Sequence, residues 1–314
     1  MEYSTVTVLT GVPEEIVRLK MTDRKPLLIR NWDIGSCVKD WTSEYVSNKV
    51  GSEPVKIHVA KDEKMDFINK NFIYKTLPFD ELIRRVFRYK QEDYFVDPFE
   101  KYYMRSLGND PRGRDVANFF LQCRTLAEDL NVPPFYDEKD FFSSVFRASS
   151  QGVQLWTHYD IMDNILIQVR GKKRIVLWPP SEVDNIYLIG DKSEVLDIDN
   201  PDLEKYPKFK NAIRYECTML PGDILFIPAL WFHNTIAIEP CLGVNIFWKN
   251  LSHQLYYKND SYGNKDLLPA AKSLHSLETA IKSLKILPSD YRNFYISRMI
   301  KTLKSNLTED NDCV

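Results

Sequence analysis

The feature that most constrains the fold of this chain is a histidine and an aspartate two positions apart, followed much later in the sequence by a second histidine. His158-Tyr159-Asp160 forms the first part, and His233 closes the segment Phe226–His233. Side chains alternate along a strand, so His158 and Asp160 are expected to point to the same face. A second histidine from a distant strand would complete a two-histidine, one-carboxylate face with open coordination positions, an arrangement suited to Fe(II) and O2. We predict that His158, Asp160 and His233 bind a catalytic metal ion.

The composition predicts a protein with a sizeable core that resides in a reducing compartment. The 314 residues, 44% of them hydrophobic, can bury a sizeable core. The five cysteines are scattered without a Cys-x-x-Cys pair, which argues against a disulfide framework or a zinc-thiolate site. Neither a secretory signal nor an apolar run of roughly 20 residues is present. We therefore expect a cytoplasmic protein that does not cross a membrane, and leave a visit to the nucleus open.

The net charge of −2 bears on nucleic-acid binding. A chain with this balance does not attract nucleic acid over its whole surface, so any such site must be a local patch. Two basic clusters could form one, although most clusters of this kind are simply solvated faces. They are Arg84, Arg85, Arg88 and Lys90, and Lys205, Lys208, Lys210 and Arg214.

Short apolar runs separated by turn residues follow one another from Ser144 onward. Arg170-Gly171-Lys172 and Pro221-Gly222-Asp223 supply two of the turns. Many short strands in one block predict a mainly β protein with helices, built as a double-stranded β-helix, the jelly roll of the cupin type. The expected strands are Phe146–Ala148, Leu155–His158, Asn164–Val169, Arg174–Trp178, Ile213–Thr218, Ile224–Ile227 and Gly243–Trp248.

The flanks of this block have a different pattern. Residues 1–100 mix short strands with a helix expected after Pro78, which predicts an N-terminal α/β elaboration before a jelly-roll domain at 101–265. Residues 266–305 carry two apolar helical stripes, the second capped by Ser289, and 306–314 read as a flexible tail. The stripes predict either an isologous homodimer or packing on the protein's own barrel.

Taken alone, the His-x-Asp spacing is also compatible with a strand histidine that bonds to a backbone carbonyl. Its surroundings favour the metal site. Gln154-Leu155-Trp156-Thr157 precedes it, and Pro221–Pro228 precedes the distal histidine. These segments resemble the JmjC-domain 2-oxoglutarate oxygenases, especially the small hydroxylases related to the factor-inhibiting asparaginyl hydroxylase. The resemblance implies a jelly-roll fold, Fe(II) on the three predicted ligands, and 2-oxoglutarate and O2 as cosubstrates.

The resemblance also implies residues that hold 2-oxoglutarate. Lys173 stands where the family places a lysine that pairs with the far carboxylate, whereas Lys172 reads as a solvated turn residue. Asn164 and Asn245 match asparagines that line the same pocket. Tyr103, or its neighbour Tyr102, matches a tyrosine whose hydroxyl reaches the cosubstrate, and aromatic packing is the alternative for either.

One position departs from the family pattern. Related hydroxylases often carry a threonine three residues before the first histidine, where it donates a hydrogen bond to the cosubstrate. Here that position is Leu155, which cannot donate. Thr157, Ser149 or water would have to replace the missing donor, or the cosubstrate is held by fewer contacts.

Longer segments resemble a tRNA-modifying branch of the family, which implies a tRNA partner. The implied reaction is hydroxylation of the wybutosine-type guanosine in the anticodon loop of tRNA-Phe. The alternatives are hydroxylation of a protein side chain and a cupin-like binding module without metal. The matching segments are Pro26–Arg30, Asn71–Phe79, Lys101–Gly108, Asp199–Leu203, Phe226–Asn234 and Ser261–Asp266.

Overall fold

The computed structural model describes residues 3–110 and 112–307, so 308–314 of the predicted tail lie outside the described residues. The chain forms two compact units. The larger runs up to His253 and includes Lys258–Asn264, and the smaller comprises Gln254–Tyr257 and the residues from Lys265 onward. Each unit is described separately below.

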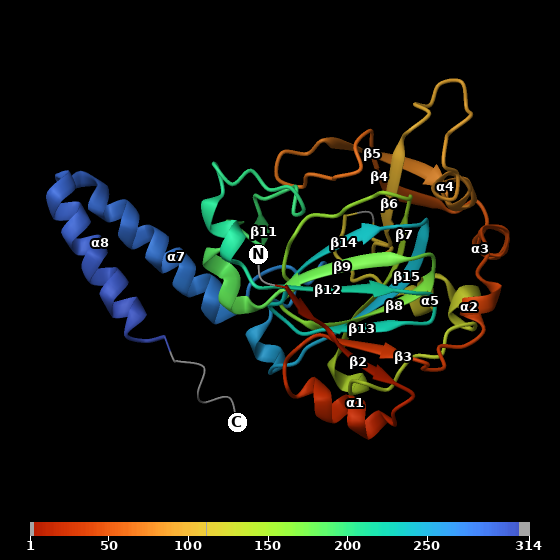
Figure 1. The fold of residues 1–314 in the computed structure, drawn as a ribbon, viewed down its shortest axis with the longest axis horizontal. Helices are drawn as coiled ribbons and strands as arrows, with labels where there is room; N and C mark the ends of the chain where they lie inside the picture. The colour runs from red at the N-terminus through yellow and green to blue at the C-terminus, as the bar shows by residue number, and fades with distance from the viewer. Residues whose placement is uncertain (1–2, 111, 308–314) are drawn as a thin grey trace. The chain divides into compact units, whose positions relative to one another are not determined.

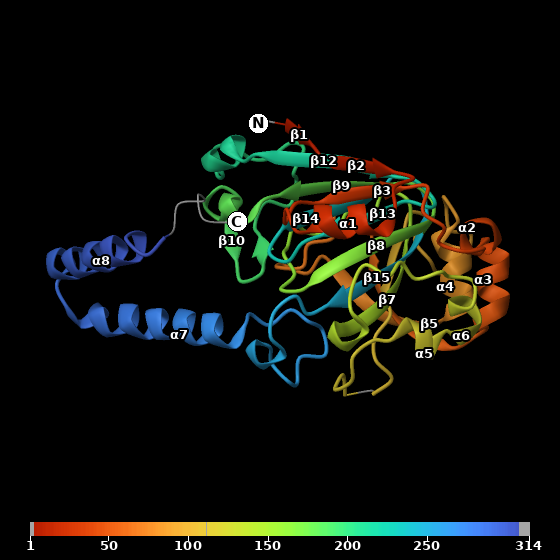
Figure 2. The same cartoon turned by 90° about the horizontal axis from the view of Figure 1, so that it is seen from below.

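The larger unit is built on two sheets that face each other, as Figures 1 and 2 show. A nine-stranded sheet has the order β2-β3-β13-β8-β15-β7-β6-β4-β5, and a four-stranded sheet has the order β1-β12-β9-β14. This arrangement confirms the predicted mainly β jelly roll. The strands are β1 Tyr3–Thr5, β2 Thr7–Thr10, β3 Leu27–Arg30, β4 Pro54–Ala60, β5 Phe72–Pro78, β6 Lys101–Arg105, β7 Phe141–Ser149, β8 Asp163–Arg170, β9 Lys173–Trp178, β12 Arg214–Met219, β13 Ile224–Ile227, β14 Phe232–Ala237 and β15 Cys241–Trp248, with a separate hairpin of β10 Leu188–Ile189 and β11 Lys192–Ser193.

Alternating side chains on the central strands supply two cores. On β8, Ile165 and Ile167 point into the cluster beneath the helices, whereas Leu166 points into the cluster that includes residues of the four-stranded sheet, such as Leu177. Both faces of this strand are therefore apolar, which explains its continuous hydrophobic run. The sequence shows such a run without revealing which face lies inside the barrel.

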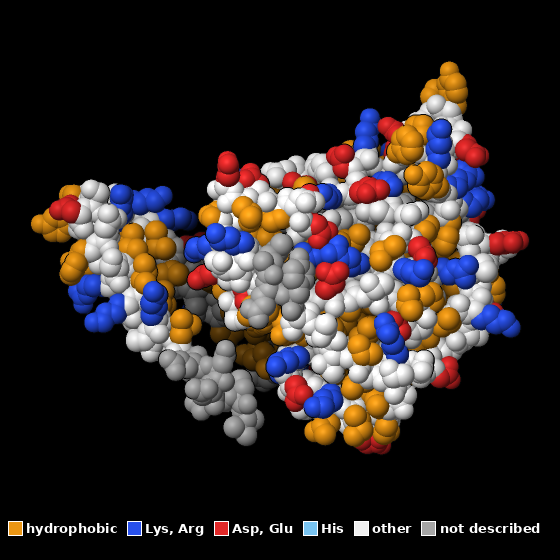
Figure 3. Space-filling view, viewed as in Figure 1, with side chains coloured by type: hydrophobic (Ala, Val, Ile, Leu, Met, Phe, Trp, Pro, Cys, Tyr) orange, Lys and Arg blue, Asp and Glu red, His pale blue; other side chains and the backbone are white. Residues whose placement is uncertain are grey.

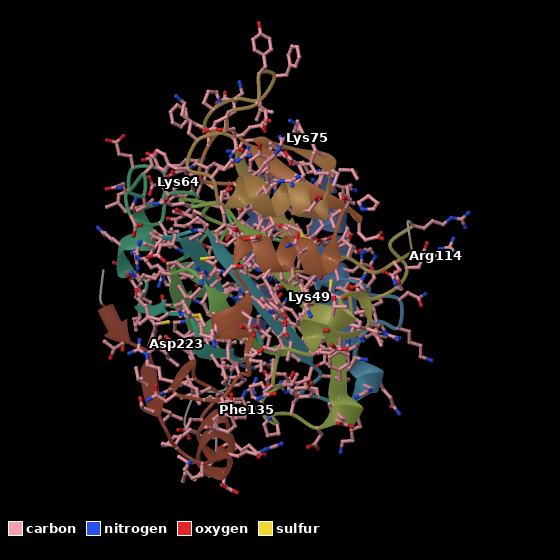
Figure 4. The ribbon with its side chains drawn as sticks, turned by 90° about the vertical axis from the view of Figure 1, so that its right-hand side faces the viewer. Lys49, Lys64, Lys75, Arg114, Phe135 and Asp223 are labelled. Atoms are coloured by element: carbon pink, nitrogen blue, oxygen red, sulfur yellow. The ribbon has the colours of Figure 1, made fainter. Side chains whose placement is uncertain are left out.

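The N-terminal residues extend the large sheet, because β2 to β5 are paired into it. Helices cover its outer face, and Figure 4 views the molecule from this side. Helix α4 buries Phe79, Leu82, Ile83 and Val86, so the helix expected after Pro78 is present. The helices of this unit are α1 Glu14–Met21, α2 Cys37–Asp40, α3 Ser43–Val50, α4 Phe79–Val86, α5 Phe119–Gln122 and α6 Arg124–Ala127.

One predicted strand is absent from the structure, and one observed strand was not predicted. Residues 155–158 do not form a continuous strand; only isolated bridges at Gln154 and His158 join this segment to β14. Strand β14 itself was not predicted, because polar Asn234 and Thr235 interrupt its apolar pattern. The irregular segment and the unpredicted strand lie next to each other, and together they carry both histidines.

The smaller unit contains helices α7 Leu268–Ser283 and α8 Ser289–Lys304. The predicted cap at Ser289 is wrong: Pro288 is the N-cap, and no side chain caps α8, because Ser289 is already the first helical residue. Neither helix contains a buried residue, and Leu274, Ile281 and Phe294 are exposed. None of the helices among the described residues has the length and apolar character needed to cross a bilayer.

The turn between β8 and β9 gives a test of the fold. Gly171 has a φ of +74°, and an added Cβ would lie 2.0 Å from the carbonyl oxygen of Pro240. Gly171→Ala should lower the free energy of unfolding by more than about 2 kcal/mol, since it combines left-handed strain with a backbone clash. Urea denaturation measures the change.

Gly190→Ala is the matched control. Gly190 has a φ of +60° but no neighbour within 4 Å of the added Cβ, so only the strain of about 1 kcal/mol is expected. Equal losses in the two variants would contradict the close approach of Gly171 to Pro240.

Candidate metal centre

The two histidines face each other across a short antiparallel pair. The His158 amide donates to the His233 carbonyl at 3.2 Å, and the His233 amide donates back at 2.8 Å. Residues opposite each other in such a pair extend their side chains to the same face. The ring centroids of His158 and His233 are accordingly 4.3 Å apart. Backbone pairing alone therefore brings together two ligands that are far apart in the sequence.

Each imidazole is oriented by a carbonyl two residues earlier in the chain. Nδ1 of His158 lies 3.0 Å from the carbonyl oxygen of Trp156, and Nδ1 of His233 lies 3.1 Å from that of Trp231. Because a carbonyl only accepts, each Nδ1 carries the hydrogen and each Nε2 keeps a free lone pair. Metal-binding histidines are commonly held in this way. The sequence left two alternatives for His158, a hydrogen bond to a backbone carbonyl and a metal site. The structure shows that the two are compatible.

Asp160 completes the group. Its Oδ2 lies 3.6 Å from Nε2 of His233, and one ligand atom from each of His158, Asp160 and His233 lies within 4.8 Å of the others. The backbone amide of Leu230 donates to the Asp160 carbonyl at 2.8 Å. Leu230 adopts a φ of +70°, in the left-handed region, so the turn before β14 is strained at the point where it contacts the Asp160 loop.

A second carboxylate, Asp163, fastens the same loop without joining the metal group. Asp163 accepts two hydrogen bonds of 2.6 Å from the guanidinium of Arg24 and one of 2.8 Å from the amide of Ala229. On the opposite face of the histidine pair, the side-chain amide of Asn234 donates to the Thr157 hydroxyl at 3.1 Å. Both ligand-bearing segments are therefore held by the protein itself.

The donor set fits a divalent ion of the iron type. Burial lowers the pKa of His158 well below its ordinary value, with a further contribution from His233, so His158 is neutral, as a ligand must be. Two imidazoles and one carboxylate on one side of an ion leave the other positions open, which is typical of non-haem Fe(II) sites.

A cavity lies directly beside this group. Its wall includes all three predicted ligands. Lys173 also lines it and is 5% exposed. Burial lowers the pKa of its ammonium. Among the described residues, Lys173 has no hydrogen-bond or ion-pair partner, so an unpaired cation lines the cavity.

The other predicted cosubstrate residues form a chain of hydrogen bonds through an arginine that the sequence did not single out. Arg147 donates to the hydroxyl of Tyr103 and, at 2.7 Å, to Oδ1 of Asn245. The Asn245 amide donates to Asn164 at 3.0 Å. Burying an arginine on the inner face of a strand is costly, so an arginine within the apolar run of β7 could have indicated a functional residue at position 147. The structure brings Tyr103, Asn164 and Asn245 into one network.

Tyr102 and Tyr103 point to opposite faces of β6. The hydroxyl of Tyr102 donates to Glu100 at 2.7 Å and belongs to the core beneath the helices. Tyr103 lines the cavity together with Arg147. The geometry therefore favours Tyr103 for contact with a bound cosubstrate.

Leu155 lines the cavity with its apolar side chain, as the sequence implied. Of the proposed substitutes for the missing donor, Thr157 is engaged by Asn234, whereas Ser149 lies in the cavity wall. Thr235 of β14 lies there too and was not anticipated. Besides Tyr103, the cavity wall therefore contains two residues with hydroxyl groups, Ser149 and Thr235.

An outer funnel leads to the same group from the surface. His158 and Asp160 belong to its wall, as do the aromatic side chains of Phe67, Tyr74 and Trp156. Its cationic residues, none of them singled out by the sequence, are Lys56, Arg105, Arg147 and Lys192.

The two basic clusters predicted from the sequence do not line this funnel. Arg84 and Arg85 are paired with Glu81, and Arg214 is buried against Asp199. On the face of the larger unit shown in Figure 3, basic and acidic side chains are interspersed. The cations that matter for the site come from the funnel.

Comparison with known proteins assigns this arrangement to a family. The family model described as "Cupin-like domain" matches residues 13–254, which contain the metal group and every strand of the two sheets except β1 and β2. The chain belongs to the cupin-like family. The kinship with JmjC-type oxygenases expected from the sequence is thereby confirmed at the level of the family.

Several relatives are similar to nearly the whole of this chain. "tRNA wybutosine-synthesizing protein 5" of Homo sapiens is 51% identical over 99% of this chain and 98% of its own length. The protein of the same name from Danio rerio is 51% identical over 97% of this chain and 93% of its own length. "tRNA wybutosine-synthesizing protein 4" of Gibberella zeae is 35% identical over 94% of this chain, which spans 29% of that larger protein.

Removal of one ligand should abolish tight metal binding. Asp160→Ala is expected to weaken Fe(II) binding by at least about a hundredfold, more than typical changes outside the ligand set. Anaerobic isothermal titration of the purified protein with Fe(II) measures the affinity. Asp191→Asn, at an acidic residue of the funnel wall outside the ligand group, should bind Fe(II) like the wild type. Unchanged affinity in folded Asp160→Ala protein would refute the site.

Proposed function

We propose that this protein is an Fe(II)- and 2-oxoglutarate-dependent hydroxylase of the wybutosine-type guanosine in the anticodon loop of tRNA-Phe. The observation that supports this chemistry is the ammonium of Lys173, which is buried in the cavity beside the two histidines and Asp160 and has no partner among the described residues. A dicarboxylate that chelates the metal ion with one end would pair with Lys173 at the other. The near full-length relatives named for tRNA wybutosine synthesis support the substrate.

The bound cofactors would supply the oxidation: 2-oxoglutarate and O2 yield succinate and CO2, and the second oxygen atom enters the substrate as a hydroxyl group. The protein's own contribution is position and exclusion of water. His158, His233 and Asp160 hold the metal ion, and Arg147 keeps the Tyr103 hydroxyl in the cavity wall. Apolar Leu155, Leu166 and Ile227 line the same cavity and restrict water.

The funnel suits a base that has left its stack. A modified guanine must reach the metal centre through the aromatic wall of Phe67, Tyr74 and Trp156, and aromatic side chains are the usual partners of unstacked bases. A nucleotide in a single-stranded loop pays a smaller unstacking cost than one in a duplex. These features favour an anticodon loop over helical RNA.

Protein side-chain hydroxylation is the alternative, and one experiment separates the two. The purified protein, loaded with Fe(II) and 2-oxoglutarate, is incubated with tRNA-Phe that carries the unhydroxylated base, or with a protein extract. Succinate release and nucleoside mass spectrometry are followed together. We expect tRNA-dependent succinate and a gain of one oxygen on the base; turnover with the protein extract alone would replace the proposed substrate.

Lys173→Met tests the cosubstrate site in the same assay. The Michaelis constant for 2-oxoglutarate should rise by about ten- to a hundredfold, because a charge-assisted contact is lost. Lys172→Met is the matched control, since Lys172 lies outside the cavity and pairs with Glu239 at 3.0 Å. Equal constants in the two variants would remove Lys173 from the site.

We further propose that the helices of residues 266–305 join two copies of the chain. Their exposed apolar side chains, among them Leu274, Ile281 and Phe294, form a surface suited to a second copy related by twofold symmetry. Light scattering at micromolar concentration should give about twice the chain mass of 36.9 kDa.

Phe294→Asp should shift that mass to a monomer, because it places a charge on the apolar surface. Ser276→Asp introduces the same residue at an exposed polar position of α7 and should leave the dimer intact. A monomeric wild-type protein would refute the proposal.

A further inference from the structure

Arg105 ends β6 at the mouth of the funnel. It lines the funnel beside Tyr262 and Leu107, and the same three residues also line an adjoining groove that extends towards Asn109 and Arg112. A ligand that enters the funnel from this groove must pass the guanidinium. Arg105 therefore lies where the reacting base and the rest of its nucleotide would meet.

The position of this arginine is electrostatically unfavourable in the protein alone. Arg105 lies directly opposite Arg147 in the antiparallel pairing of β6 with β7. Like charges at such positions destabilise a sheet. Arg147 is satisfied by Tyr103 and Asn245, both neutral. Burial, together with the charge of Arg147, lowers the pKa of Arg105.

Arg105 also lacks an anionic partner. One of its terminal nitrogens donates to the Tyr262 carbonyl at 3.1 Å, and its guanidinium lies 5.3 Å from the centre of the Tyr262 ring. Its Nε is inaccessible to solvent and makes no hydrogen bond among the described residues. No carboxylate of those residues lies within ion-pair distance. By contrast, Arg174 contacts both Asp199 and Glu216. A cation pair without a carboxylate is expected where the protein binds an anion.

An aromatic wall lies in the same funnel. The ring centroids of Phe67 and Trp156 are 3.5 Å apart, and Trp156 lies 4.7 Å from His158. His58 and Tyr74 continue the wall, with centroids 4.8 Å apart. Nε1 of Trp156 is buried without an acceptor among the described residues. The funnel therefore combines flat apolar faces with unpaired donors, which suits a planar ring that carries an acidic group.

We propose that Arg105 determines substrate specificity by binding an anionic group of the nucleotide whose base stacks on this wall. The anion is either an acidic substituent on the base or the phosphate of the same nucleotide, and the guanidinium fork suits both. The assignment rests on the proposed function, because it takes the hydroxylated base as the ligand of the funnel.

The test compares Arg105→Gln and Arg105→Lys with the wild type on tRNA-Phe carrying the unhydroxylated base. Arg105→Gln should raise the Michaelis constant for tRNA by about ten- to a hundredfold, whereas Arg105→Lys should recover part of the loss. The Michaelis constant for 2-oxoglutarate is measured in both variants as well, and a rise confined to the constant for tRNA is the expected result. Arg124→Gln, at an exposed arginine of α6, is the control.

Two competitors identify the anion. The modified nucleoside and its 5′-monophosphate are each tested as inhibitors of tRNA hydroxylation. If Arg105→Gln weakens both equally, the anion is on the base; if it weakens only the monophosphate, the anion is the phosphate. Either result supports the assignment.

A Michaelis constant for tRNA within about twofold of the wild type in Arg105→Gln would overturn the assignment and leave the proposed function intact. Equal losses in Arg105→Gln and Arg124→Gln would also overturn it, since the effect would then be unspecific. Failure of the wild type to hydroxylate the tRNA, with succinate formation present, would refute the proposed substrate and the role of Arg105 with it.

Discussion

The paired backbone hydrogen bonds between His158 and His233 determine how the rest of the site is built. They join an irregular segment to β14, so the two imidazoles extend to one face. The carbonyls of Trp156 and Trp231 then set the ring orientations, and the contacts of Leu230 and Ala229 hold the Asp160 loop. Cavity and funnel both adjoin this pair, which makes it the common wall of the proposed cosubstrate and substrate sites.

The pairing of charged side chains is a second feature of the interior. Two buried charged residues of the larger unit have a partner of opposite charge: Asp163 pairs with Arg24, and Arg214 pairs with Asp199. Among the described residues, the buried Lys173 and the partly buried Arg105 have no anionic partner, and they line the cavity and the funnel beside the metal group. A cation without a partner costs stability in such surroundings, and the proposed cosubstrate and substrate would each supply an anion.

Local patterns in the sequence predicted much of the fold and part of the site. The apolar runs of β8, β13 and β15 and the stripes of α4, α7 and α8 repeat with strand or helix periodicity, so neighbouring residues suffice to identify them. Arg105 and Arg147 could not be found in this way, because their significance depends on the register of β6 with β7. The choice between Tyr102 and Tyr103 depends on the same register. Strand β14 was missed because its polar residues face a partner that is distant in the sequence.

The donor set of the metal group has a consequence for which ion the protein binds in the cell. Two imidazoles and one carboxylate can bind divalent ions other than iron. Copper, nickel and zinc bind nitrogen and oxygen donors more tightly than ferrous iron does. If the resident ion is ferrous iron, as we propose, the fraction of active molecules would depend on the supply of iron relative to these competing ions.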